Sequence, residues 1–571
     1  MISVEENFFN RFPRLADGRA RSFSQPVVDL LRRITCENQI NRVLHDFGAF
    51  SGFDFIERLL DDLQVSYRIA NTDRDNIPSE GRLVVVANHP LGALDALALM
   101  QLLGTVRRDV RILANDILLQ LKPLSPLLLP VNVLGDKASA PRRMREAYRA
   151  LEREEVLLVF PAGEVSRMGP KGIRDGRWSS GFARLAKHAD APVLPVHITA
   201  HNSASFYGLS MLAKPLSSLL LAREMFGASR TRIDIAVGEP VPCSELGRAS
   251  AERAAQSMQR HVYQLARRRS PVFATSRTIA HPESPLVLRD ALKRAQALGK
   301  TRDGKTILLF DAQPDCPLLR EIGRLRELSF RRVGEGTGAR RDLDRFDTYY
   351  RHLVLWDENA LTLVGAYRLG EGDDILSSRG ASGLYSSSLF EYAPTARNFL
   401  AAGVELGRSF VQPAFWGSRS LDYLWQGIGA YLRTRPEMRY LFGPVSLSAS
   451  LPADARDWIV HFHRHYYGSC EALATARNPF VVSNAVDKLA SDAWIDRDIA
   501  AGMVVLREKL AQLNCGLPVL YRQYADLCEP DGVEFLAFGT DPAFCHCVDG
   551  LIRLDLTRLR AAKRERYLSV V

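Results

Sequence analysis

The sequence lacks an apolar run long enough to cross a membrane and a leader of the secretory type. A spanning helix needs about 20 consecutive apolar residues, and the longest uncharged apolar stretch, residues 123–135, is broken by prolines. The N-terminus carries Glu5 and Glu6 and has no apolar segment of the signal-peptide kind. We therefore expect any contact with a membrane to be peripheral, without a transmembrane helix.

The sequence also lacks a disulfide framework and a zinc-site pattern. Its eight cysteines are scattered along the chain, which favours a reducing cytoplasm. Cys545, His546 and Cys547 are adjacent, but a structural zinc site needs four ligands, and no second ligand pair stands at the required spacing. We expect no bound metal.

Low-complexity tracts and internal repeats are absent as well, and the composition is globular, with 46% hydrophobic and 25% charged residues. A chain of 571 residues is too long for one ordinary core, so two large domains are expected. The net charge of +10 favours an acidic partner. Nucleic acid, anionic lipid headgroups and an acidic carrier protein fit that charge equally well.

The first half alternates apolar strands with helices. Its predicted strands are residues 83–87, 156–160, 192–198 and 232–237, and its predicted helices are residues 91–103 and 251–268. This alternation is typical of a mostly parallel sheet with helices on both faces. Residues 270–285 are basic and then proline-punctuated, and predict a hinge between a domain of residues 1–275 and a domain of residues 276–571.

The second half predicts a mixed α/β domain that is more antiparallel than the first. Its predicted strands are residues 306–310, 352–356, 361–367, 389–392, 406–412, 440–447, 518–524 and 532–538, and its predicted helices are residues 318–330, 421–432, 453–465 and the basic segment 558–567.

His89 and Asp95 are the first candidates for chemistry. They follow the predicted strand at 83–87, at the end where open α/β sheets present catalytic groups. Histidine takes the proton of an attacking hydroxyl near neutral pH, and a carboxylate on its other ring nitrogen fixes the tautomer and stabilises the imidazolium. For an isolated pair the structural alternative is a histidine that caps the helix and an aspartate that binds backbone amides.

Two later segments favour catalysis. Residues 160–167 read Phe-Pro-Ala-Gly-Glu-Val-Ser-Arg, and residues 192–198 read Pro-Val-Leu-Pro-Val-His-Ile. With the His–Asp pair, they resemble over about residues 80–200 the glycerolipid acyltransferase family, known for a His-x4-Asp motif, a Phe-Pro-Glu-Gly-Thr-Arg loop and a Val-Pro-Val block. The resemblance implies the fold of the glycerolipid acyltransferases and an O-acyl transfer reaction, in which His89 and Asp95 would be the catalytic residues. Gly163, Glu164 and Arg167 would bind substrate.

Three departures from the family pattern bear on the acyl acceptor. The His–Asp gap is one residue longer, the loop acid follows Gly163 instead of preceding it, and residues 130–137 contain no arginine. In the family, the second and third motifs are associated with the acceptor's phosphate. Loss of a bidentate arginine disfavours a phosphate-bearing acceptor and points to a non-phosphorylated lyso-lipid. Arg167, Lys171 or Lys137 remains an alternative anion ligand.

The second half carries spaced charges. These are Arg326, Asp342, Asp344, Asp347, Arg368, Glu405 and Arg408. Their spacing resembles the autoinducer-synthase branch of the GNAT-like N-acyltransferases, and the Glu-Leu-Gly-Arg-Ser run at 405–409 resembles the N-acyltransferases that make lyso-ornithine lipid. The resemblance covers about residues 305–450 and implies a GNAT-like mixed α/β fold. Ion pairs that merely order a loop are the alternative.

An N-acyltransferase site of this kind must hold a zwitterionic amino acid. Carboxylates bind its ammonium group and arginines bind its carboxylate. A carboxylate, or a water beside it, must remove a proton because only a neutral amine attacks a thioester. By resemblance Glu405 takes that role, and the other charged residues named above form the binding network.

Together the two halves resemble the bifunctional ornithine lipid synthases. The resemblance implies that the second domain N-acylates ornithine from a 3-hydroxyacyl carrier protein and that the first domain esterifies the 3-hydroxyl from a second acyl carrier protein. It implies no cofactor beyond these thioesters. We expect acyl carrier protein, ornithine and a membrane lipid surface as partners, and no nucleic acid.

The expected location is the cytoplasm, peripherally on the inner face of the cytoplasmic membrane, with residues 215–226 and the basic C-terminal helix as candidate membrane contacts. Two alternatives remain: a lysophosphatidate acyltransferase fused to an N-acyltransferase, and a non-catalytic hemolysin-like membrane-binding protein. Ornithine, lysine, glycine and glutamine all remain open as the acylated amino acid.

Overall fold

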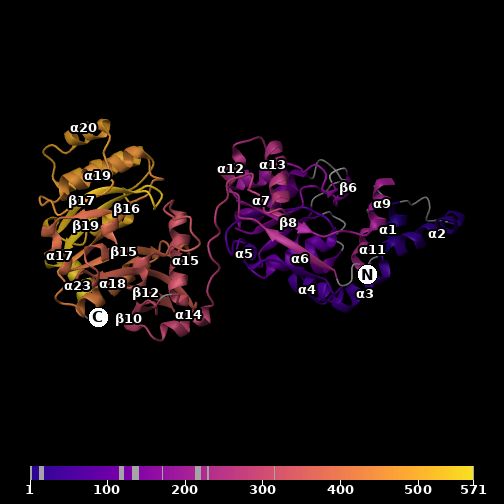
Figure 1. Ribbon diagram of the computed structural model, residues 1–571, viewed down its shortest axis with the longest axis horizontal. Helices are drawn as coiled ribbons and strands as arrows, with labels where there is room; N and C mark the ends of the chain where they lie inside the picture. Colours follow the sequence, from indigo (N-terminus) through magenta and orange to yellow (C-terminus); the bar gives the residue numbers. More distant parts are fainter. Residues whose placement is uncertain are drawn as a thin grey trace. The chain divides into compact units, whose positions relative to one another are not determined.

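The computed structural model describes residues 3–11, 18–114, 121–130, 140–169, 172–212, 220–227, 231–313 and 315–569. The chain divides into two compact units, Met1–His281 and Pro282–Val571. Figure 1 shows that each unit is built from a sheet with helices packed on it.

The first unit contains a seven-stranded sheet. In sheet order its strands are β1 (Ser66–Arg68), β9 (Arg232–Val237), β8 (Val193–Thr199), β2 (Leu83–Ala87), β5 (Val156–Val159), β3 (Val110–Ala114) and β4 (Leu128–Pro130). Neighbouring strands are parallel except β8 and β9. The predicted mostly parallel sheet is confirmed.

Helices cover both faces of this sheet. Side chains along a strand point alternately to its two faces, and in β2 the side chains on both faces are apolar, so both faces must be buried. Val85 belongs to the hydrophobic core on the face that two helices cover, and Val84 belongs to the core on the face that three helices cover. The covering helices are α4 (Phe53–Asp62) and α6 (Ala93–Gly104) on one face, and α7 (Ala140–Glu152), α8 (Gly181–Ala189) and α13 (Ala251–Leu265) on the other.

The remaining elements of the first unit are short or peripheral. They are α1 (Val4–Arg11), α2 (Gly18–Ile34), α3 (Glu37–Phe47), α5 (Asn71–Arg74), the hairpin of β6 (Arg167–Gly169) and β7 (Gly172–Arg174), α9 (Ala204–Leu212), α11 (Leu221–Gly227) and α12 (Cys243–Gly247). Because β2, β5 and β8 are parallel and adjacent, the segments that follow them meet at one edge of the sheet.

The second unit contains an eight-stranded mixed sheet. In sheet order its strands are β10 (Gln296–Lys300), β11 (Thr306–Asp311), β12 (Arg351–Asp357), β13 (Thr362–Glu371), β15 (Gly403–Val411), β16 (Tyr440–Leu447), β19 (Cys547–Asp555) and β18 (Val533–Asp541). All neighbours are antiparallel except β15 and β16. The predicted mixed α/β domain is confirmed.

The two faces of this sheet differ in character. Leu353, Tyr367 and Leu406 belong to a hydrophobic core that includes α18 (Ser420–Arg433) and α19 (Ala453–Tyr467). The neighbouring residues His352, Arg368 and Glu405 therefore point to the opposite face. On that face Arg326 of α15 (Pro317–Arg332) contacts His352, so the polar side chains lie beneath this helix.

One predicted strand is wrong. Residues 518–524 form a helix, α22 (Val519–Ala525), that begins after Pro518. Tyr524 and Ala525 are buried three and four residues after the buried Tyr521, which is the spacing of a helix and not the alternation of a strand. Further elements of this unit are α14 (Pro285–Leu292), α16 (Gly372–Arg379), β14 (Phe390–Tyr392), α17 (Arg397–Ala401), β17 (Ala474–Ala476), α20 (Asn484–Ala493), α21 (Ile499–Gln512) and α23 (Ala561–Leu568).

Within the described ranges, no helix has the length and apolar character needed to span a membrane. Of the candidate membrane contacts, residues 215–219 lie outside the described residues. The predicted basic C-terminal helix is α23, in which Tyr567 is buried near Trp425 of α18. Membrane contact by either segment stays a prediction.

Candidate active sites

His89 follows β2, and Asp95 lies in the first turn of α6. Nδ1 of His89 lies 3.2 Å from Oδ2 of the fully buried Asp95. The same oxygen accepts the backbone N–H groups of Leu91 at 2.7 Å and Gly92 at 3.1 Å. Burial raises the pKa of Asp95, whereas His89 and the two N–H groups favour its ionised form. The pair has the arrangement of a proton-accepting histidine and an orienting carboxylate.

The loop after β5 packs against this pair. Phe160 stacks on the His89 ring, with centroids 4.1 Å apart and planes inclined by 26°. Ser166 donates its backbone N–H to the His89 carbonyl at 2.8 Å. Gly92 has a φ of 88°, and a Cβ atom there would lie 3.3 Å from Val165 Cγ1. The structure therefore brings residues 160–167 next to the His–Asp pair.

The predicted substrate-binding residues of this loop lie at its outer part. Gly163 has a φ of 68°, in the left-handed region that favours glycine. Glu164 is exposed and lies 3.2 Å from Nε of the half-buried Arg167. Lys137 and Lys171, the alternative anion ligands, lie outside the described residues. Binding of substrate by these residues stays a prediction.

Two residues that the sequence did not single out hold His89 in place. The Asn88 amide exchanges two hydrogen bonds with the backbone of Ile198, at 2.7 and 2.9 Å, and ties the end of β2 to the end of β8. Asp175, which follows β7, accepts the backbone N–H of His89 at 3.1 Å. No local sequence signal links Asp175 to His89, because the two residues are 86 positions apart in sequence.

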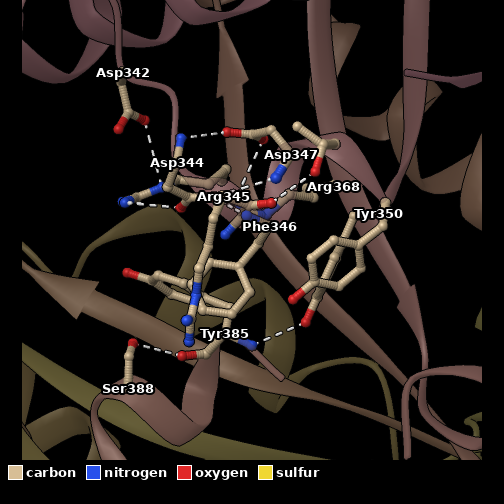
Figure 2. Close-up of polar contacts among 12 residues, drawn as sticks. Asp342, Asp344, Arg345, Phe346, Asp347, Tyr350, Arg368, Tyr385 and Ser388 are labelled. Atoms are coloured by element: carbon tan, nitrogen blue, oxygen red, sulfur yellow. Dashed lines mark hydrogen bonds and ion pairs between the residues drawn. The ribbon is translucent and has the colours of Figure 1, made fainter. Parts of the chain in front are cut away.

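The second unit contains a buried cluster of arginines and aspartates, shown in Figure 2. Arg326 of α15 places Nη1 2.6 Å from Oδ1 of Asp347. Arg368 of β13 places Nη1 3.1 Å from the same Asp347 oxygen and 2.6 Å from Oδ1 of Asp344. Two guanidinium groups thus share one carboxylate. Its negative charge offsets part of their positive charge in a buried site.

Arg408 joins the cluster from β15. Its Nε lies 3.4 Å from Oδ2 of Asp342, and its Nη2 lies 3.7 Å from Oδ2 of Asp344. Arg408 has a φ of 49°, at a bulge where the register between β13 and β15 shifts. Burial raises the pKa of Asp342, opposed by Arg408 and Arg326. The bulge thus directs a charged side chain toward the cluster.

His352 of β12 completes the cluster and was not predicted. Its Nε2 lies 3.0 Å from the Asp347 carbonyl, and its Nδ1 lies 3.4 Å from Nη2 of Arg326. Burial, reinforced by Arg326, lowers the pKa of His352 to about 4. The imidazole is therefore neutral at pH 7, donating from Nε2 and accepting at Nδ1.

Aromatic rings border the charged cluster. The Arg368 guanidinium lies 4.8 Å from the ring centroid of Tyr385, 5.2 Å from that of Tyr350 and 5.7 Å from that of Phe346. Nε and Nη2 of Arg368 are buried and have no hydrogen-bond partner among the described residues. A planar arginine with two such donors suits the carboxylate of an amino acid.

Glu405 lies beside the cluster, held by donors. Its Oε1 accepts the backbone N–H of Ser386 at 2.6 Å, and its Oε2 accepts the backbone N–H of Tyr385 at 3.0 Å and the hydroxyl of Tyr350. Burial and the Glu405 charge raise the pKa of Tyr350, so this phenol stays a donor. The structure places Glu405 next to the aromatic rings of Tyr350 and Tyr385 that border the cluster. Its role as the base stays a prediction.

Comparison with known proteins agrees with this division. Residues 13–269 match the family model described as "Acyltransferase", and residues 325–426 match the one described as "Acetyltransferase (GNAT) domain". A lyso-glycine lipid O-acyltransferase of Bacteroides thetaiotaomicron is 34% identical over 223 residues, which are 38% of this chain and 80% of that protein. The chain belongs to the acyltransferase family.

Two N-acyltransferases are also similar to this acyltransferase. A glycine N(alpha)-acyltransferase of Bacteroides thetaiotaomicron is 29% identical over 262 residues, 44% of this chain and 77% of that protein. An L-ornithine N(alpha)-acyltransferase of Brucella abortus is 34% identical over 176 residues, 25% of this chain and 60% of that protein. The acyltransferase is therefore an enzyme that combines an acyltransferase domain with a GNAT domain.

Proposed function

We propose that this acyltransferase makes an acylated ornithine lipid in two steps. In the second unit, the α-amine of ornithine attacks a 3-hydroxyacyl thioester, an amide bond forms and the thiol leaves. In the first unit, the new 3-hydroxyl attacks a second acyl thioester, an ester bond forms and another thiol leaves. The observation that carries the proposal is the presence in one chain of a His–Asp pair and a buried arginine–aspartate site.

The first unit has the groups that the ester-forming step needs. With Nδ1 of His89 directed to Asp95, Nε2 remains to take the hydroxyl proton as the oxygen attacks the thioester. The imidazolium then returns that proton to the departing thiolate. The Asp95 carboxylate stabilises the imidazolium between these two transfers.

The second unit has the groups that bind an amino acid. The buried nitrogens of Arg368 suit its carboxylate, and Asp344, whose Oδ2 has no hydrogen-bond partner in the described part of the chain, suits an ammonium group. Glu405, or a water beside it, removes the proton that makes the amine nucleophilic. The similarity to an L-ornithine N(alpha)-acyltransferase supports ornithine as the acceptor.

A non-phosphorylated acceptor for the first unit has two supports. Arg167 already contacts Glu164, and the similar O-acyltransferase of Bacteroides thetaiotaomicron is named for a lyso-glycine lipid. The N-acylated product of the second unit carries one free hydroxyl of the required kind. Lysophosphatidate is the competing acceptor, and its acylation would favour a glycerophospholipid enzyme.

Acyl carrier protein is the proposed donor for both steps, with no further cofactor. The net charge of +10 suits both this acidic carrier and an anionic lipid surface. We place the enzyme peripherally on the inner face of the cytoplasmic membrane, where its lipid product is needed.

The test uses the purified full chain, ornithine and 3-hydroxyacyl carrier protein, with products resolved by mass spectrometry. The expected result is lyso-ornithine lipid, followed by the diacylated lipid when a second acyl carrier protein is added. Parallel reactions with glycine, lysine, glutamine and lysophosphatidate establish the acceptor. Acylation of lysophosphatidate without any acylated amino acid contradicts the proposal, and no acylated product in any reaction supports a non-catalytic membrane-binding protein.

A further inference from the structure

We propose that Asp175 is a positioning residue for His89, which fixes the peptide of the histidine and thereby the place of its imidazole. The inference rests on the O-acyltransferase function proposed for the first unit. It concerns a residue outside the His–Asp pair and outside the loop predicted to bind substrate.

Three donors converge on the Asp175 carboxylate. Oδ1 accepts the backbone N–H of His89 at 3.1 Å and the hydroxyl of Ser166 at 2.5 Å. Oδ2 accepts the indole N–H of Trp178 at 2.8 Å. Because both oxygens only accept, the geometry fits the ionised carboxylate.

Asp175 and Ser166 close a ring of hydrogen bonds around the His89 peptide. Asp175 binds the N–H of His89, Ser166 donates its backbone N–H to the His89 carbonyl at 2.8 Å, and the Ser166 hydroxyl binds Asp175. The main chain on both sides of the His89 Cα atom is therefore fixed by the loop after β5 and the segment after β7.

Asp175 is itself held in place. It is buried, and its backbone N–H is donated to the hydroxyl of Tyr263 in α13 at 2.9 Å. Gln259 of the same helix donates to the carbonyls of Asp175 at 3.4 Å and Gly176 at 2.8 Å. Because α13 packs on the sheet, the carboxylate is fixed before any substrate binds, as a positioning group must be.

The donors around Asp175 also bear on its charge. Burial raises the pKa of Asp175, while Ser166, the His89 N–H and Trp178 favour the ionised form. A charged carboxylate makes stronger hydrogen bonds than a neutral acceptor, so ionised Asp175 holds the His89 peptide more firmly.

The main test is Asp175→Asn in the full chain, assayed with added lyso-ornithine lipid and acyl carrier protein thioester. An asparagine keeps one acceptor oxygen, but its amide nitrogen then faces the indole N–H of Trp178, which is also a donor, so the side chain shifts and moves the His89 peptide with it. We expect kcat for O-acylation to fall about 100-fold, the effect of a small misplacement of a reacting group, with little change in KM for the lyso-lipid.

Two variants separate positioning from folding. Asp109→Asn is the matched control: Asp109 pairs with Arg107 at 2.6 Å, just before β3, at the opposite end of the strands from His89. It is expected to change thermal stability without lowering kcat for O-acylation. Trp178→Phe keeps an aromatic ring and removes one donor to Asp175, and is expected to lower kcat less than Asp175→Asn does.

A folded Asp175→Asn enzyme with wild-type kcat for O-acylation overturns the inference. If that variant does not fold, a folded Trp178→Phe enzyme with unchanged kcat overturns it instead. His89→Ala separates a failure of the proposed O-acyltransferase function from a failure of the role assigned to Asp175. Persistent O-acylation in His89→Ala contradicts the proposed function itself, whereas loss there with a normal Asp175→Asn contradicts only the role of Asp175.

Discussion

Oδ2 of Asp95 lies 3.2 Å from Nδ1 of His89 and also accepts the backbone N–H groups of Leu91 and Gly92. The contacts that the structural and the catalytic alternative each require are thus made by one carboxylate, and its catalytic role stays a prediction. It caps the first turn of α6 and faces the imidazole from there. The helix end fixes the carboxylate, and the carboxylate in turn orients the ring.

Asp95→Asn is expected to lower kcat for O-acylation by about 10²- to 10⁴-fold, because an amide neither fixes the required tautomer nor stabilises the imidazolium. N-acylation by the same protein should be unchanged. Rates of both reactions on one preparation provide the measurement. Equal losses in the two reactions would show that the variant is generally damaged and would contradict a specific role.

Asp347→Asn is expected to destabilise the second unit by about 3–5 kcal/mol, because it leaves the buried guanidinium groups of Arg326 and Arg368 without their shared carboxylate. Urea unfolding followed by tryptophan fluorescence measures the change. Asp373→Asn, at an exposed position of α16, is the matched control and should stay within about 0.5 kcal/mol of the wild type. Similar midpoints for the two variants would contradict the importance of the cluster.

Arg368→Lys keeps the charge but removes the planar fork that reaches Asp344 and Asp347 together. We expect KM for ornithine to rise at least about tenfold, corresponding to one charge-assisted hydrogen bond. O-acylation of added lyso-lipid should be unaffected. Steady-state kinetics with varied ornithine gives the answer, and an unchanged KM would show that Arg368 does not bind the amino acid.

Stability should fall as the pH falls below about 6.5, the ordinary histidine pKa. Burial lowers the pKa of His197, His352 and His463 to about 4 each. Between these values the unfolded chain binds protons that the folded chain does not, so the free energy of unfolding decreases as the pH falls from about 6.5 toward about 4. Urea unfolding at pH 7.5 and pH 5 tests this, and equal midpoints would contradict it.

Much of the fold was predictable because its strands are continuous apolar runs. The predicted strand at 83–87 coincides with β2, and that at 440–447 coincides with β16. The sequence predicts a strand at residues 518–524, because a short apolar run with tyrosines fits a strand as well as a helix. Only the three-dimensional structure shows that this segment is a helix, with Tyr521 and Tyr524 packed into the same hydrophobic core.

The candidate sites were predictable where a motif is local. His89 and Asp95 lie six residues apart, and the structure brings them together as the pattern predicts. Asp175 and His352 were not predicted because their partners come from separate segments of the chain. Three-dimensional packing alone makes them neighbours of the predicted residues.

The most direct test of two sequential acylations is mass spectrometry of lipids from a host expressing the full chain. We expect His89→Ala to accumulate lyso-ornithine lipid without the diacylated product, while His45→Ala, an exposed histidine of the same unit, matches the wild type. Glu405→Gln should abolish both lipids, and the exposed Glu391→Gln should abolish neither. Diacylated lipid at wild-type levels in His89→Ala would contradict the account.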